Sequence, residues 1–149
     1  GGRVMHGVIS RLVDVGIPVM GHIGLLPQSV LKDGGYRMHG KTQEEADAIL
    51  DDALAVQEAG AFAVVLEGVP ETLAEEITGR LTIPTIGIGA GPRCDGQVQV
   101  ITDILGLGGD FVPKHAKIYA QLGEAALNGL KQYVQEVTKG NFTPGRPEN

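Results

Sequence analysis

Two side chains capable of proton chemistry stand on short apolar runs of this 149-residue sequence. Glu67 ends the run at residues 61–66 and is followed by Gly68, while His22 lies within a second run at 18–24. A carboxylate that is partly removed from water is suited to accepting a proton, and an imidazole can bind a substrate oxygen or orient a neighbouring group. Each residue also has a structural alternative, because Glu67 can accept backbone N–H bonds in the turn that follows it and His22 can tie down the next loop.

The elements that must hold these side chains are strands of a parallel sheet. A run as short and apolar as 61–66 is typical of a strand buried on both faces by helices. Glu67 would then lie at the carboxyl end of that strand, where parallel α/β folds carry their functional groups. The first predicted elements are a helix at 4–14, a strand at 18–24 and a loop at 25–41. A helix follows, begun by a capping box of Thr42 and Glu45 and ended by Gly60, and then a strand at 61–67 and a helix from Pro70 to Gly79. The last predicted elements are a strand at 83–91, a strand at 97–103 for which a helix is the alternative, and a helix at 113–139 with a break at Gly123.

Strands that alternate with helices predict an α/β fold with a parallel sheet and helices outside it. Four strands are too few to close a barrel of the (β/α)8 type. The sequence therefore allows either a small open sheet or the second half of such a barrel. The chain begins Gly1-Gly2-Arg3 without a methionine, and we expect it to be a segment of a longer polypeptide.

Composition argues against several classes of function. The formal net charge is −6 and Lys and Arg do not cluster, which disfavours a nucleic-acid surface. The single cysteine, Cys94, cannot form an intrachain disulfide, which favours a reducing compartment. No apolar run approaches the roughly 20 residues needed to span a bilayer. We therefore expect a cytoplasmic protein that binds neither nucleic acid nor membrane.

Other residues carry weaker signals. The glycines at 87–91 resemble phosphate-binding loops but lack the Lys-Ser/Thr pair of a P-loop, so close backbone packing is the simpler interpretation. Asp95 and Asp103 have no second acid or histidine at metal-ligand spacing, and we expect them to serve a turn and a helix cap. Cys94 has no base near it in the sequence, which favours a bystander over a nucleophile.

Four segments, taken in order, carry a family resemblance: IPVMGHIGLLPQSV at 17–30, GAFAVVLEGVP at 60–70, IPTIGIGAG at 83–91 and CDGQ at 94–97. With them, the sequence resembles the ketopantoate hydroxymethyltransferases over nearly its whole length. The resemblance implies a (β/α)8 TIM barrel of the phosphoenolpyruvate/pyruvate type, of which this chain supplies about the last four strands and the outer helices. Residues 1–140 would be the C-terminal half of the barrel and 141–149 a flexible C-terminal tail.

The resemblance also implies a reaction. The family transfers a hydroxymethyl group from 5,10-methylenetetrahydrofolate to 3-methyl-2-oxobutanoate, which gives 2-dehydropantoate in pantothenate biosynthesis. Glu67 matches the proton acceptor, and His22 would face the same barrel mouth as a substrate-binding residue. The resemblance implies Mg²⁺ as a Lewis acid whose ligands lie in the other half of the barrel, with none in this chain. It further implies a homo-oligomer, commonly a decamer.

Two alternatives stay open. One is another enzyme of the phosphoenolpyruvate/pyruvate barrel group that acts on a different 2-oxo acid. The other is a catalytically incomplete half-barrel that serves as an assembly module, since half a barrel exposes sheet edges and an apolar inner face.

Overall fold

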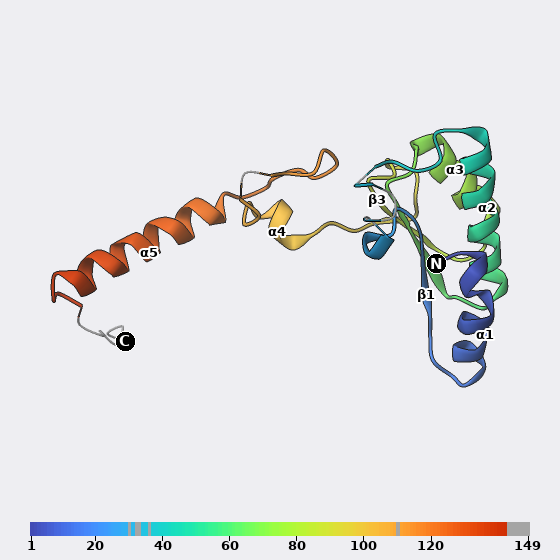
Figure 1. Cartoon of the computed structure of the whole chain (residues 1–149), viewed down its shortest axis with the longest axis horizontal. Helices are drawn as coiled ribbons and strands as arrows, with labels where there is room; N and C mark the ends of the chain where they lie inside the picture. Colours follow the sequence, from blue (N-terminus) through green and yellow to red (C-terminus); the bar gives the residue numbers. More distant parts are fainter. Residues whose placement is uncertain (30, 32–33, 36, 110, 143–149) are drawn as a thin grey trace. The chain divides into compact units, whose positions relative to one another are not determined.

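A computed structural model of the chain describes residues 1–29, 31, 34–35, 37–109 and 111–142 (Figure 1). Contacts between Cα atoms divide the chain into two compact units, Gly1–Val98 and Gln99–Asn149. The predicted tail at 141–149 lies outside the described residues from position 143 onward.

The first unit is built on a four-stranded sheet in which every strand pair is parallel and the spatial order is β1-β2-β3-β4. The strands are β1 (Met20–Gly24), β2 (Ala63–Glu67), β3 (Thr85–Ile88) and β4 (Gly96–Gln97). The helices are η1 (Arg3–Met5), α1 (His6–Asp14), η2 (Pro27–Ser29), α2 (Gln43–Glu58) and α3 (Glu71–Arg80). The predicted parallel α/β arrangement is confirmed.

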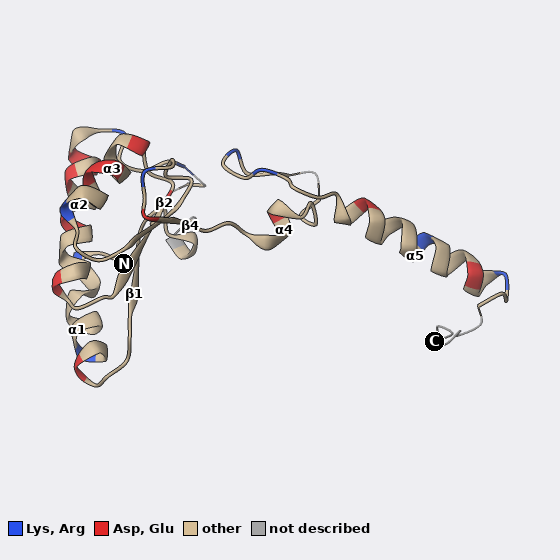
Figure 2. Cartoon of the chain, turned by 180° about the vertical axis from the view of Figure 1, so that it is seen from behind, with Lys and Arg blue, Asp and Glu red and all other residues tan. Residues whose placement is uncertain are grey.

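Helices α1, α2 and α3 lie on one side of the sheet (Figure 1). Ile23, Leu66 and Thr85 are buried under the helices, whereas the residues beside them in sequence are partly or fully exposed. The helices of the described residues cover one face of the strand at 61–66, and burial of its other face stays a prediction. Val65 points to the face that no helix of the described residues covers, because a strand turns alternate side chains to opposite faces. Acidic residues are frequent along α2 and α3 (Figure 2).

Two side chains, those of Thr42 and Glu45, fix the start of α2. The Oγ1 atom of Thr42 accepts the N–H of Glu45 at 3.2 Å, as the predicted capping box requires. The second half of the box differs, because the Glu45 carboxylate accepts the N–H groups of Gly40 at 3.0 Å and Lys41 at 3.1 Å, upstream of the cap itself. Glu45 thereby fastens the preceding loop to the helix.

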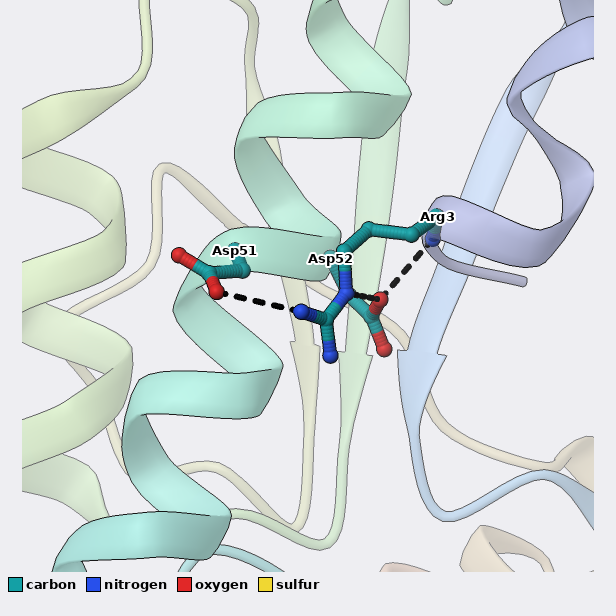
Figure 3. A network of polar contacts seen from close by, with 3 residues as sticks. All are labelled: Arg3, Asp51 and Asp52. Carbon is teal, nitrogen blue, oxygen red and sulfur yellow. Dashed lines mark hydrogen bonds and ion pairs between the residues drawn. The ribbon is translucent and has the colours of Figure 1, made fainter.

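The chain that leads into α1 is joined to the outer surface of α2 (Figure 3). One oxygen of Asp52 accepts the backbone N–H of Arg3 at 2.8 Å and its Nε–H at 3.1 Å, and the same guanidinium donates to Asp51 at 3.2 Å. The first N–H of a helix has no partner within the helix. Asp52 supplies that partner from a different element.

The connection from β3 to β4 is unusually short for parallel strands, which are normally joined by a crossover of a dozen or more residues. Residues 89–95 make it without a helix, and Gly96 pairs beside Ile86. The predicted strand at 97–103 is therefore largely wrong, since the strand ends at Gln97, residues 98–100 are neither strand nor helix, and a short helix, α4 (Ile101–Ile104), follows.

The second unit contains α4 and the long helix α5 (Leu122–Thr138). The prediction of a helix from residue 113 with a break at Gly123 is wrong, because residues 113–121 are not helical and Gly123 lies inside α5. The backbone N–H groups of Tyr119, Leu122 and Gly123 instead donate to the carbonyls of the last residue of α4 and of the two residues after it, at 2.7, 3.0 and 3.1 Å. None of the helices in the described ranges has the length and apolar character needed to cross a bilayer.

Candidate active site

Glu67 is held at the carboxyl edge of the sheet by the hydrogen bonds of its own backbone. It is the last residue of β2, and its carbonyl accepts the N–H of Leu25 at 2.8 Å. The next peptide is also fixed, because the N–H of Gly68 donates to Ile88 at 2.9 Å and its carbonyl accepts the N–H of His39 at 2.9 Å. The backbone that carries the carboxylate is thus bonded to β1, to β3 and to the loop before α2.

Gly24 makes the close approach of β1 to this position possible. It is the register partner of Glu67 and has φ 86°, a backbone conformation that favours glycine. A Cβ atom at this residue would collide with the carbonyl oxygen of Glu67 and would lie 2.8 Å from a methyl group of Val69. Without a side chain at this residue, the end of β1 can lie directly against the end of β2.

His22 is the hydrogen-bond partner of the Glu67 carboxylate. Its Nε2 lies 2.9 Å from Oε2 of Glu67, although the two residues are 45 positions apart in the sequence. They share the uncovered face, because His22 pairs with Val65 and Val65 lies two residues before Glu67 on the same strand. The side chains keep 35% and 15% of their surface exposed, so the bond is partly shielded from water. The structure brings together the two residues that the sequence singles out for proton chemistry.

Apolar side chains lie beside the carboxylate on the same face. Ile88 of β3 is the register partner of Glu67, and Ile86 is the partner of Val65. Sequence reasoning placed these isoleucines in a strand but not on the face of Glu67. The signal available in the sequence was the alternation Ile86-Gly87-Ile88. It places both isoleucines on one face of the strand and only a glycine between them on the other face. The site therefore pairs one acid with an aliphatic surface.

A cavity of about 580 Å³ adjoins His22 on the side of α2. Arg37, Glu45 and Asp52 are among the residues that line it. Arg37 donates to Glu45 at 3.2 Å, and this bond, with the N–H of Lys41, holds the pKa of the Glu45 carboxyl below its ordinary value. The Arg37 guanidinium is therefore engaged with a carboxylate of its own chain.

The glycine loop at 87–91 packs against its own chain. A Cβ at Gly87 would lie 3.0 Å from Sγ of Cys94, and one at Gly91 would lie 2.7 Å from Glu71. Gln97 also donates to the Gly91 carbonyl at 2.9 Å. These contacts favour the packing interpretation of the glycines.

Asp95 and Cys94 lie at the other end of β3, away from Glu67. The Asp95 carboxylate accepts the N–H of Thr85 at 2.8 Å and contacts its hydroxyl at 3.1 Å, which holds the short connection closed. Burial raises the pKa of the Cys94 thiol, against the opposing effect of hydrogen bonds from Thr85 and Thr78. A thiol with a raised pKa is a poor nucleophile, in keeping with the predicted bystander role.

Metal-binding side chains do not gather in one place. Within the described ranges, no three side chains of His, Cys, Asp or Glu are grouped so that they could hold a metal ion. In the pair of His22 and Glu67, the facing atoms bond to each other. These donor groups do not fit a Mg²⁺ site.

Comparison with known proteins gives one consistent match. A family model described as ketopantoate hydroxymethyltransferase matches residues 1–145. Curated relatives named 3-methyl-2-oxobutanoate hydroxymethyltransferase include those of Pelodictyon phaeoclathratiforme, 53% identical over 95% of this chain and 51% of the relative, and Geobacter sulfurreducens, 56% identical over 95% and 53%. The relative from Heliobacterium modesticaldum is 54% identical over 100% of this chain and 53% of its own length.

The chain thus spans about half the length of the curated relatives that it matches. The matched range includes both β1 with His22 and β2 with Glu67. A family model that covers nearly all of the chain, together with relatives more than half identical to it, identifies this chain as a member of the ketopantoate hydroxymethyltransferase family.

Proposed function

We propose that residues 1–149 supply the proton-accepting side of a hydroxymethyltransferase active site. The enzyme would transfer a hydroxymethyl group from 5,10-methylenetetrahydrofolate to 3-methyl-2-oxobutanoate and form 2-dehydropantoate. The observation that carries the proposal is the Glu67 carboxylate, fixed at the carboxyl edge of a parallel sheet, beside aliphatic side chains and bonded to His22. Family membership favours this reaction over that of another barrel enzyme acting on a different 2-oxo acid.

The role of Glu67 is to remove the proton from C3 of the oxo acid. C3 is adjacent to the ketone, so the electron pair of the broken C–H bond passes into an enolate, and its carbon then attacks the one-carbon unit. Oε2 of Glu67 bonds to His22, whereas Oε1 has no hydrogen-bond partner among the residues that the structure describes. Oε1 is therefore the oxygen that takes the proton. The aliphatic neighbours keep water away from the reacting atoms.

The sheet is proposed to be part of a (β/α)8 barrel of the phosphoenolpyruvate/pyruvate type. Its strands are parallel and follow sequence order, and helices cover only one of its faces. In such a barrel the uncovered face is the interior, and the carboxyl ends of the strands carry the chemistry. The proposed Mg²⁺ would take its ligands from outside residues 1–149. A cytoplasmic location and assembly into a homo-oligomer, as a decamer, remain predictions from the resemblance.

The proposal is tested by isotope exchange in the full-length protein. Wild type and Glu67→Gln are incubated with 3-methyl-2-oxobutanoate in D₂O, and loss of the C3 proton is followed by NMR. Glu67→Gln should lower the exchange rate by about 10²–10⁴-fold, the usual contribution of a positioned general base. The control is Glu58→Gln, since Glu58 is an exposed acid at the end of α2. Exchange at the wild-type rate in Glu67→Gln would remove this residue from the role.

A further inference from the structure

We propose that His22 is a positioning residue for Glu67: it fixes the carboxylate so that Oε1 faces the substrate, and it does not bind the substrate itself. The inference rests on the proposed function, because it gives His22 its effect through the base. The resemblance suggested substrate binding for this histidine, whereas the structure joins its Nε2 to Glu67 at 2.9 Å.

The first argument is geometric. A glutamate side chain at the end of a strand has three rotatable bonds, and holding it in one arrangement costs conformational entropy. Backbone hydrogen bonds fix the main chain of Glu67, but they leave the carboxylate free to rotate. Among the described residues, Nε2 of His22 is the one hydrogen-bond partner of this carboxylate. It therefore selects which oxygen is engaged and which one is left for the C–H bond.

The second argument comes from the register. The residue directly opposite Glu67 on β1 is Gly24, which has no side chain. The carboxylate can therefore lean back along the sheet toward His22, which lies two positions earlier on β1 and on the same face. A Cβ at position 24 would collide with the Glu67 carbonyl oxygen and meet Val69, so a larger residue would displace the end of β2 that carries the carboxylate. The His22–Glu67 pair thus depends on Gly24. The backbone φ of 86° at this position favours glycine for a separate reason.

The third argument concerns the proton. As the base, Glu67 is a carboxylate and can only accept a hydrogen bond, so the Nε2 of His22 is the atom that carries the hydrogen of this charge-assisted bond. In the reaction, the C3 proton passes to Oε1, the electron pair stays on the substrate, and His22 keeps its Nε2 hydrogen throughout. The histidine neither gains nor loses a proton, so its contribution is orientation. A misplacement of about 1 Å can cost about 10²-fold in rate.

The test uses His22→Ala and His22→Gln in the full-length protein, each alone and combined with Glu67→Gln. Glutamine can place an amide N–H near the position of Nε2, whereas alanine cannot. Three quantities are measured: the C3 exchange rate at saturating 3-methyl-2-oxobutanoate, the dissociation constant of that acid by calorimetry, and the melting temperature. His22→Ala should lower the saturated exchange rate by about 10–10²-fold without changing the dissociation constant, and His22→Gln should recover part of the rate.

The outcomes separate the alternatives. If His22 binds the substrate, His22→Ala will raise the dissociation constant of the oxo acid both in the wild-type background and in Glu67→Gln. The inference then fails. It also fails if saturated exchange is unchanged in His22→Ala while Glu67→Gln abolishes it, a result that leaves the proposed function intact. If Glu67→Gln exchanges at the wild-type rate, the proposed function itself fails. The melting temperature shows whether any loss comes from unfolding, and His22→Gln then serves as the folded variant.

Discussion

Gly24 and Glu67 face each other at the ends of neighbouring parallel strands, and the glycine is what allows the strands to end so close together. The carbonyl of Glu67 accepts the N–H of Leu25 at 2.8 Å, which pins the end of β2 to the residue after Gly24. The position of the candidate base is therefore set by the residue across from it, as well as by its own strand.

Replacing Gly24 with alanine should destabilise the protein more than the backbone conformation alone explains. Gly16 provides the matched control, since it has the same φ of 86° and nothing within 4 Å of an added Cβ. Gly16→Ala should cost about 1–3 kcal/mol of backbone strain. Gly24→Ala should cost about 1–3 kcal/mol more, because the new Cβ meets the Glu67 carbonyl and Val69. Denaturant unfolding of the full-length protein measures both. Equal losses would mean that the strand ends separate without penalty.

Asp95→Ala should weaken the short connection between β3 and β4. Thr85 is fully buried, and its N–H donates to the Asp95 carboxylate at 2.8 Å. Without that acceptor, a buried N–H loses its partner, which costs about 1–3 kcal/mol of unfolding free energy. The control is Asp47→Ala, because Asp47 is exposed and its bond to Gln43 lies on the surface of α2. A loss at Asp95 no larger than at Asp47 would contradict the clamp assigned to it.

The Cys94 thiol should react slowly with alkylating reagents in the folded protein. Burial raises the pKa of this thiol, so at any given alkaline pH a smaller fraction is the reactive thiolate than in an unfolded chain. The pH profile of the alkylation rate should therefore shift toward higher pH relative to the same protein in guanidinium. Iodoacetamide labelling followed by mass spectrometry gives both rates. Coinciding profiles would show that burial does not control this thiol.

Glu45 should contribute stability that acid removes. The Arg37 guanidinium, followed by the Lys41 N–H, lowers the pKa of this carboxyl in the folded state. A group whose folded pKa is depressed contributes stability that is present above the unfolded pKa and is lost as the pH falls through the folded pKa. Glu45→Gln should therefore flatten the fall in unfolding free energy between about pH 5 and 3. Glu44→Gln, one residue away and exposed, should keep the wild-type slope; equal slopes in both variants would contradict the prediction.

Local signals predicted the parts of the fold that local chemistry controls. Thr42 and Gly60 bound α2 as expected, and the apolar runs at β1 and β2 became strands. The strand at 97–103 failed because alternating apolar residues suit a short strand or a helix equally well. The helix expected from 113 failed because the N–H of Tyr119 bonds back to Ile104, a contact that no local window contains.

The site shows the same division. Glu67 and His22 were each predicted from their types and their places at strand ends, and the family resemblance favoured both. Their bond was not predictable, because it depends on the register of β1 against β2 across 45 positions. What covers the second face of the sheet was likewise not predictable from the residues alone. An apolar run indicates a strand but does not reveal how many layers pack against it.

The one-sided cover of the sheet has a consequence for variation within these strands. Ile23, Leu66 and Thr85 contact the helices, whereas His22, Glu67 and Ile88 face away from them. Tolerance to substitution along β1, β2 and β3 should therefore follow a period of two residues. At one set of positions, replacements should reduce the yield of folded protein. At the intervening positions, replacements should leave the yield of folded protein intact and alter turnover. One library of variants, selected once for folded protein and once for turnover, would therefore identify two alternating sets of sensitive positions in the same three strands.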